Sequence, residues 1–257
     1  MARGFTGGDS DKLTATISAA ASGAWSLGAW MFPTADTGGG GVEVGDSAAM
    51  RGFRLYLDFS LRMEAYQRRS GGNGFIIRTS GHFHFTTSVW AFTVATCSGV
   101  DEESAVRIYQ GTISTGVAEM TDGGTAGGSG SGLDSGGTAL TVGNRLATPT
   151  TSSFTGRIFA PFMVPWEMTT ADMDQVRTGD VCGLTDGGTP AFFFGLEGSA
   201  LTSYSAVGPS YTLTDTGTST ETDPITLTAC GGGGDTVGRR IVRPRPLRNV
   251  GHPAYLS

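Results

Sequence analysis

The stretch Phe-Arg-Leu-Tyr-Leu-Asp-Phe-Ser-Leu-Arg-Met, residues 53–63, places a large apolar side chain at every second position and mostly polar ones between. Successive side chains of a β-strand point to opposite faces, so this alternation predicts one long strand with a buried face and a solvated face. It is the clearest period-two signal in the chain. The chain is therefore expected to be a β protein whose sheets bury one face.

Shorter runs of the same kind recur along the chain, bounded by Gly, Asp, Ser or Asn. They lie at residues 13–17, 25–32, 75–78, 82–85, 89–96, 106–109, 140–142, 154–159 and 191–194. Turns are expected to be frequent, because 42 of the 257 residues are glycine and 10 are proline. Many short strands with few helices predict an antiparallel sandwich or barrel.

One segment, residues 169–179, carries helix signals instead. These are an N-cap at Thr169, acids in the first turn at Asp172 and Asp174, an apolar pair at Met173 and Val176, and a C-terminal Gly179. We therefore expect a single short surface helix here.

Two low-complexity stretches divide the rest. Residues 121–137 are rich in paired glycines and predict a mobile loop or hairpin tip. Residues 231–234 are four glycines that separate the body from a tail, residues 235–257. The tail holds five arginines and one acid, and its prolines favour an extended arm. The arginines are Arg239, Arg240, Arg243, Arg245 and Arg248.

Composition excludes several classes of protein. The chain carries a net charge of −6 although the tail is basic, which argues against nucleic acid as a partner. Cys97, Cys182 and Cys230 have spacings that fit neither a disulfide framework nor a zinc ribbon, so we expect reduced, structural thiols. The N-terminus lacks a signal-peptide pattern, and the longest apolar run, residues 159–166, is too short to span a bilayer. A protein without membrane segments is expected.

The order of these strands resembles that of laminin-G-like and concanavalin-A-like jelly-roll domains, in the form found in bacteriophage structural proteins and bacterial surface proteins. The similar stretches are residues 5–13 (opening strand), 25–30 (tryptophan-bearing strand), 89–95 (central strand), 106–111, and the closing pair 140–143 and 154–158. The resemblance implies an all-β antiparallel sandwich over residues 1–180, a β extension packed on it over residues 181–234, and an extended arm over residues 235–257.

The chain also departs from that family. Phe159-Ala160-Pro161 stands where an aspartate often follows the closing strand, and the paired carboxylates that hold calcium in laminin-type modules are missing from the sequence. The family's calcium and ligand sites are therefore not transferred to this chain.

Catalytic carboxylates are not apparent in the sequence. Glycosidases on such a sandwich need two carboxylates at a defined separation. Glu64 stands alone at a strand end, and Asp101, Glu102 and Glu103 fall in a predicted turn. We therefore expect a non-enzymatic protein with no catalytic residues and no cofactor.

Other residues remain as candidates for binding. His82 and His84 share a strand face but leave a zinc site short of ligands, so no metal site is predicted, and the question stays open for this pair and for the acids at residues 101–103. The four tryptophans can stack on sugar rings where they are exposed. Trp25, Trp30 and Trp90 lie in core-like strands, so core packing is expected for these three.

The sequence thus favours a structural protein of a bacteriophage virion, such as a capsid decoration, head-fibre or tail component, assembled in the host cytoplasm. Its expected partners are major capsid or tail subunits, bound through the five arginines of the arm, and further copies of itself. The alternative is a glycan-binding adhesion module on a virion or bacterial surface, with a host surface glycan as partner.

Overall fold

The structure is a computed structural model of the whole chain. It describes residues 2–8, 11–17, 23–36, 39–46, 51–58, 61–69, 75–80, 85–120, 122–127, 132–133, 139–144, 153–181, 184–186, 189–190, 192–194, 203–204 and 212–226.

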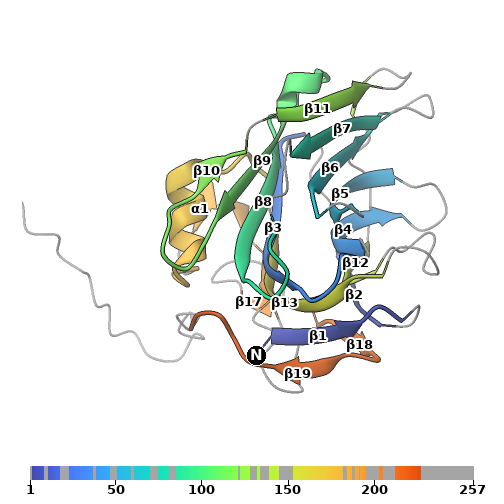
Figure 1. Cartoon of the computed structure of the whole chain (residues 1–257). Helices are drawn as coiled ribbons and strands as arrows, with labels where there is room; N and C mark the ends of the chain where they lie inside the picture. The colour runs from blue at the N-terminus through green and yellow to red at the C-terminus, as the bar shows by residue number, and fades with distance from the viewer. Residues whose placement is uncertain are drawn as a thin grey trace, which may run out of the picture.

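Two antiparallel sheets face each other across a common core (Figure 1). The first sheet has the order β10 (Ala118–Glu119), β9 (Val106–Gly111), β8 (Ala91–Cys97), β3 (Trp25–Pro33), β13 (Thr155–Val164), β1 (Ala2–Thr6) and β19 (Ser219–Glu221). The second has the order β11 (Asp122–Gly127), β7 (Phe75–Ser80), β6 (Met63–Arg68), β5 (Arg51–Leu57), β4 (Gly39–Asp46), β12 (Ala139–Val142), β2 (Lys12–Thr16) and β18 (Thr214–Thr216).

Small elements complete the described chain. They are β16 (Phe192–Phe194) on β13, β17 (Ser203–Tyr204) on β16, the pair β14 (Thr185–Asp186) and β15 (Thr189–Pro190), a 3₁₀ turn at Glu103–Ala105, and helix α1 (Thr170–Arg177). The predicted fold class, an all-β antiparallel sandwich with one short helix, is confirmed. None of the helices in the described ranges has the length and apolar character to cross a bilayer.

Residues 53–63 form a hairpin, and the single long strand predicted for them is wrong. β5 ends at Leu57 and β6 begins at Met63, and these two residues face each other in the antiparallel pair. Asp58 closes the turn, because its carboxylate accepts hydrogen bonds from the Arg62 backbone N–H at 2.9 Å and from Arg62 Nε at 2.7 Å. The alternation persists through the turn because both arms send their apolar side chains to the same face.

Two segments without an apolar signal are also strands. Residues 122–127, expected in a mobile loop, form β11 and pair with β7 at the edge of the second sheet. The glycine-rich residues 39–46 form β4, which lies between β5 and β12. At Gly39 a Cβ atom would come within 2.5 Å of the Phe154 backbone. Only glycine fits at this position, because the two backbone segments lie so close together.

The two sheets meet at a contact between Trp25 of β3 and two residues of the second sheet. The Trp25 ring stacks on Phe53 with centroids 4.3 Å apart, and its indole N–H donates to Gln67 Oε1 at 2.5 Å. All three side chains are buried, and Gln67 Nε2 donates to the Arg68 carbonyl at 2.8 Å. The Gln67 amide therefore has a hydrogen-bond partner at its oxygen and at its nitrogen.

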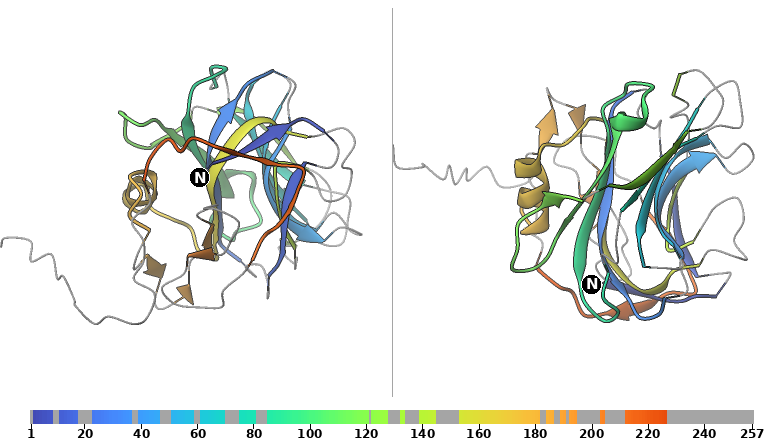
Figure 2. Two further views of the ribbon diagram at one scale, coloured as in Figure 1. Left: turned by 90° about the horizontal axis from the view of Figure 1, so that it is seen from below. Right: turned by 45° about the horizontal axis from the view of Figure 1, so that its top comes forward.

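A second apolar cluster lies on the outer face of the first sheet, where α1 covers it (Figure 2). Trp30 and Phe92 point outward from β3 and β8 and belong to the same cluster as Met173 and Val176 of the helix. The predicted helix signals are confirmed, since Thr169 and Asp172 form a capping box and Gly179 has a φ of 91°.

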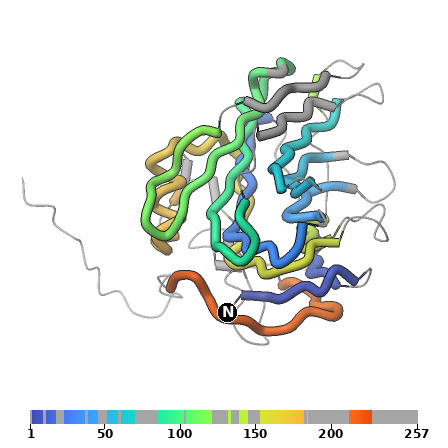
Figure 3. The backbone as a smooth tube through the Cα atoms, viewed as in Figure 1, coloured from blue at the N-terminus to red at the C-terminus, as the bar shows by residue number. Residues whose placement is uncertain are grey.

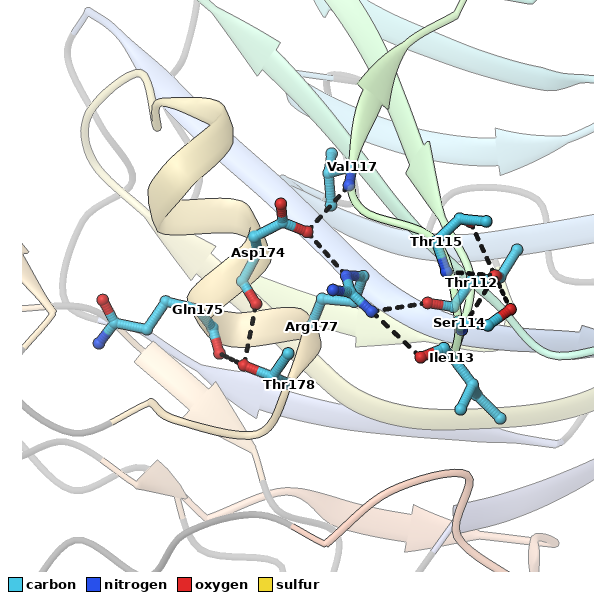
Figure 4. A network of polar contacts seen from close by, with 9 residues as sticks. All are labelled: Thr112, Ile113, Ser114, Thr115, Val117, Asp174, Gln175, Arg177 and Thr178. Carbon is cyan, nitrogen blue, oxygen red and sulfur yellow. Dashed lines mark hydrogen bonds and ion pairs between the residues drawn. The ribbon is translucent and has the colours of Figure 1, made fainter.

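A polar network fastens α1 to the loop between β9 and β10 (Figure 4). Asp174 accepts hydrogen bonds from the Val117 backbone N–H at 2.9 Å and from Arg177 Nε at 2.7 Å. Arg177 Nη1 donates in turn to the Thr112 carbonyl at 2.8 Å. Partial burial raises the pKa of Asp174, but the hydrogen bonds from Arg177 and Val117 and the charge of Arg177 outweigh it and hold the pKa below its usual value.

Strands β18 and β19 close one edge of the sandwich, because β18 pairs with β2 of the second sheet while β19 pairs with β1 of the first. Figure 3 shows this orange segment running beside the N-terminal strand. A partly buried ion pair, Arg3 Nη1 to Asp215 Oδ2 at 3.1 Å, joins the two layers there. The five arginines of the predicted arm lie outside the described residues.

We predict that Gln67→Met destabilises the protein. It removes the acceptor of the Trp25 N–H, and a buried donor without a partner costs about 1–3 kcal/mol. Urea unfolding should show a loss of that size, whereas the exposed control Thr16→Ala should change the free energy of unfolding by less than about 0.5 kcal/mol. The double variant Trp25→Phe with Gln67→Met should lose less than the sum of the single variants. A Gln67→Met protein as stable as the parent would contradict the role given to this contact.

We predict that acid breaks the hydrogen bonds by which Asp174 holds helix α1 on the loop between β9 and β10. A carboxyl whose pKa is lowered by folding stabilises the native state above its unfolded-state pKa of about 3.9, and this stabilisation is lost as the pH falls through the lower folded-state value. The measurement is the hydrogen-exchange protection factor of the Val117 amide in the parent and in Asp174→Asn. The parent should be better protected at neutral pH, and the two proteins should converge below the folded-state pKa. If the difference in Val117 protection between the parent and Asp174→Asn were the same at neutral pH and below the folded-state pKa, this role of Asp174 would be contradicted.

Candidate functional site

The carboxylates considered from the sequence are committed to internal contacts. Glu64 accepts a hydrogen bond from the Tyr66 hydroxyl at 2.5 Å. Asp101 accepts from Arg69 Nε at 2.9 Å and from the Gly132 backbone N–H at 2.7 Å, so it ties the end of β6 to a neighbouring loop. Glu102 is exposed, and its carboxylate accepts from Ser104 at 3.4 Å.

Other predicted candidates lie outside the described part of the chain. These are His82, His84, Cys182, Cys230, the side chain of Glu103 and the arm residues Arg239, Arg240, Arg243, Arg245 and Arg248. Among the residues that the structure describes, no group of three or more His, Cys, Asp or Glu side chains has the geometry of a metal site.

The outer face of the second sheet carries a self-contained polar cluster. The Arg54 guanidinium lies over the Tyr66 ring at 3.8 Å from its centroid and near Tyr56 at 5.6 Å. Tyr66 packs edge-on against Tyr56 and donates to Glu64. Burial, reinforced by that hydrogen bond, raises the pKa of Tyr66 to about 12. Tyr66 is thus bonded to Glu64 and the Arg54 guanidinium is packed against both tyrosine rings, while Arg54 Nε has no hydrogen-bond partner among the described residues.

On the outer face of the first sheet, two aromatic rings and an arginine lie beside the second apolar cluster. Five residues on five neighbouring strands or their ends lie in a line across the sheet, and we call them the Trp90 row. In order they are Trp90, Phe32, Arg157, Gly4 and Ser219. The Trp90 and Phe32 rings are 5.3 Å apart, and the Arg157 guanidinium lies over Phe32 at 4.9 Å from the ring centroid.

Trp90 differs from the other tryptophans. Trp25 and Trp30 are fully buried and Trp166 is 8% exposed, whereas Trp90 is partly exposed. The core packing predicted for Trp90 is therefore confirmed only in part, because Trp90 packs against the second apolar cluster but remains partly exposed. The reason is local, since β8 begins only at Ala91 and Trp90 packs against the margin of the second apolar cluster.

A tight turn holds Trp90 in place. Residues 86–89 are all exposed, and Val89, the neighbour of Trp90, is 48% exposed. The Ser88 N–H donates to the Pro33 carbonyl at 2.7 Å, and the Val89 N–H donates to the Thr86 carbonyl at 3.2 Å. Ser88 has a φ of 65°, a left-handed conformation that is uncommon for serine and that occurs often in binding loops.

The far end of the row brings in a carboxylate from β19. Glu221 Oε2 lies 3.3 Å from Arg157 Nε, and the two side chains are 30% and 35% exposed. Glu221 Oε1 also accepts a hydrogen bond from the Ser219 hydroxyl at 3.1 Å. Gly4 makes this possible, because a Cβ atom there would lie 2.5 Å from Ser219 Oγ and 2.9 Å from Glu221 Oε1.

A hollow of about 600 Å³ adjoins this end of the row. Its described lining is residues 220–226, so Glu221, which contacts Arg157 and Ser219 of the row, is also part of the hollow. The lining is rich in hydroxyl and carboxylate groups, with Ile225 as an apolar member. The surface as a whole combines flat aromatic faces, a cation and hydrogen-bond acceptors, the chemistry that suits a neutral, hydroxyl-rich ligand.

Little in the sequence pointed to this site. The strand-like run around Trp90 favours core packing over an exposed binding position. Arg157 and Glu221 lie far apart in the chain and carry no motif, and they meet only because β13 and β19 both pair with β1.

No family model matches the chain, and no curated protein matches its sequence significantly. Solved structures resemble it at low identity. A native heptameric SAP-like pentraxin from Limulus polyphemus is 14% identical, with a TM-score of 0.48 over 84% of this chain and 95% of the pentraxin. The CBM40 of a Ruminococcus gnavus IT-sialidase, bound to α2,3-sialyllactose, is 14% identical, with a TM-score of 0.45 over 61% of this chain and 84% of the module.

Domains LG4-5 of the mouse laminin α1 chain are also 14% identical, with a TM-score of 0.40 over 63% of this chain and 40% of theirs. All three scores are below 0.5, so the fold assignment rests on the two hydrogen-bonded sheets themselves. The bacteriophage form of the predicted resemblance has no counterpart among these three structures.

We predict that Cys97 is chemically inert in the folded protein. Its side chain is fully buried, and burial raises the pKa of the thiol to about 11, so the reactive thiolate is scarce near neutral pH. Iodoacetamide at mildly alkaline pH should leave the peptide containing Cys97 unmodified by mass spectrometry, and the same treatment in urea should alkylate it. Alkylation at equal rates in both conditions would contradict the burial.

Proposed function

We propose that the chain is a non-enzymatic glycan-binding module whose ligand stacks on Trp90. The observation that carries this proposal is the partial exposure of Trp90 beside a second aromatic ring and an arginine–glutamate pair. A flat, apolar ring face flanked by polar groups fits the C–H face and the hydroxyl rim of a sugar.

The polar groups of the Trp90 row supply both kinds of hydrogen bond that a sugar hydroxyl needs. A guanidinium has five N–H donors, and the contact with Glu221 uses the one on Nε, which leaves others for a ligand. Further from Trp90, the Glu221 carboxylate has lone pairs that can accept hydroxyl protons from a ligand that extends to it. Hydrogen bonds that involve charged groups are stronger than neutral ones, so a few contacts give useful affinity.

Rigidity supports the same proposal. Phe32 and Arg157 are on paired strands, and the turn before Trp90 is held by two backbone hydrogen bonds. Side chains that are already placed lose little entropy when they bind, so more of the contact energy appears as affinity. The cluster around Arg54 on the second sheet shares this rigidity, but its groups are engaged with one another.

The virion role favoured by the sequence stays a prediction, as do its capsid or tail partners and the anchoring by residues 235–257. A glycan-binding module displayed on a virion satisfies both hypotheses, since adhesion and attachment then use different parts of the chain.

We predict that Trp90→Ala lowers glycan affinity at least about tenfold, which corresponds to about 1.4 kcal/mol. The ligand is selected on an array of defined neutral and acidic oligosaccharides, and its dissociation constant is measured by calorimetry. Trp90→Phe should keep most of the affinity because it keeps a ring. Tyr66→Ala, checked for folding by circular dichroism, is the matched control on the second sheet and should bind like the parent.

Three results would refute this function. The parent protein could bind no glycan on the array, its binding could be unaffected by Trp90→Ala, or it could release reducing sugar from the bound glycan, which would make it an enzyme.

A further inference from the structure

We propose that the ligand of the Trp90 row is the interior of a linear oligosaccharide laid across the strands, and not a single terminal sugar. This inference rests on the proposed function and adds to it the class and orientation of the glycan. It follows from the length of the row and from the separation of its two kinds of contact.

The row crosses the first sheet at right angles to its strands. Phe32 faces Arg157, Arg157 faces Gly4, and Gly4 faces Ser219 in the paired registers. Trp90 lies one strand beyond Phe32 at 5.3 Å between rings. Neighbouring strands are about 4.8 Å apart, so four such spacings give the row a length of about 19 Å. One sugar ring covers only a fraction of that distance.

The two ends of the row make different contacts. The stacking surface is at the Trp90 end, whereas the acceptor Glu221 and the hollow against residues 220–226 are at the Ser219 end. A ligand that uses both ends must bridge Arg157 and Gly4. A short sugar held by the aromatic end therefore leaves Glu221 without a role in binding.

The middle of the row is occupied by polar side chains, because Gly4 is buried beneath Ser219 and Glu221. Gly4 has no side chain, and the Glu221 side chain lies over it, close to the position that a Cβ atom would occupy. Arg157 beside it lies on the Phe32 ring. A ligand that stacks on the aromatic end therefore crosses the Arg157–Glu221 pair before it meets the hollow, whose wall shares Glu221.

A two-ended site has a simple thermodynamic consequence. Once one end of a chain is bound, the second contact is intramolecular, so affinity rises with chain length until both ends are occupied and then levels off. A site for a terminal sugar shows no such rise.

The test is calorimetry with cello-, malto- and chito-oligosaccharides from the monomer to the hexamer. In a series that binds, the hexamer should bind at least about tenfold more tightly than the dimer. Trp90→Ala should weaken both lengths. Glu221→Gln should weaken the hexamer about fivefold or more and leave the dimer unchanged, because only the long ligand reaches that end.

Two variants guard against misfolding as an explanation. Thermal unfolding is measured for Glu221→Gln, and Arg157→Lys provides a second disruption in the middle of the row, which should also weaken long ligands more than short ones. A purely structural defect would lower the affinity for all lengths alike.

The outcomes separate this inference from the proposed function. Equal affinity for dimer and hexamer, or equal loss of both in Glu221→Gln, overturns the extended-chain inference and leaves glycan binding in place. The extended-chain inference is likewise overturned, and glycan binding kept, if none of the three series binds while the array shows a terminal sugar whose binding is lost in Trp90→Ala. If the array also shows no glycan, both proposals fail.

Discussion

The arrangement of this protein depends on the contact of Trp25 with Phe53 and Gln67, which holds the two sheets face to face. Stacking supplies apolar burial, and the buried indole N–H requires the one acceptor that Gln67 provides. With the inner face of β3 fixed in this way, the alternate residues of the same strand must point to the outer face. Trp30 and Phe32 are therefore directed away from the core between the sheets.

The outer face of the first sheet has a part that is buried under α1 and a part that is partly exposed. Helix α1 lies over Trp30 and Phe92 and makes a second apolar core, and the Asp174–Arg177 network keeps the helix on the β9–β10 loop. Two residues further along β3, Phe32 is only partly buried. The Trp90 row begins there, because Trp90 packs only against the margin of this second cluster. The N-terminal and C-terminal segments then complete it, because β1 and β19 contribute Gly4, Ser219 and Glu221.

Sequence patterns predicted the parts of the fold that are governed by local physics. Alternation predicts strands at residues 25–32 and 154–159, which lie in β3 and at the start of β13, although β13 continues to Val164. The helix follows from a cap, a first-turn acid and a terminal glycine. No alternation predicts β4, because Gly39, Gly40 and Gly41 have no side chains that could show a period-two pattern. β18 and β19 consist of polar residues and owe their order to hydrogen bonds with β2 and β1, which no local pattern records.

The candidate site was less predictable than the fold. Trp90 stands one residue before β8 and packs only against the margin of the apolar cluster that includes Met173 and Val176 of the helix. The Arg157–Glu221 pair depends on two strands meeting on either side of β1. Both are tertiary facts. The hairpin at Asp58 gives a further lesson, since unbroken alternation does not distinguish one long strand from two strands that share a face.

The most direct test of the binding site is a titration followed by NMR, which observes the four tryptophan indole N–H groups and the backbone amides together. On addition of the bound oligosaccharide, the Trp90 indole and the Glu221 amide should shift, while the indoles of Trp25 and Trp30 stay in place. Shifts confined to the outer face of the second sheet, around Arg54 and Tyr66, with Trp90 unmoved, would contradict the account.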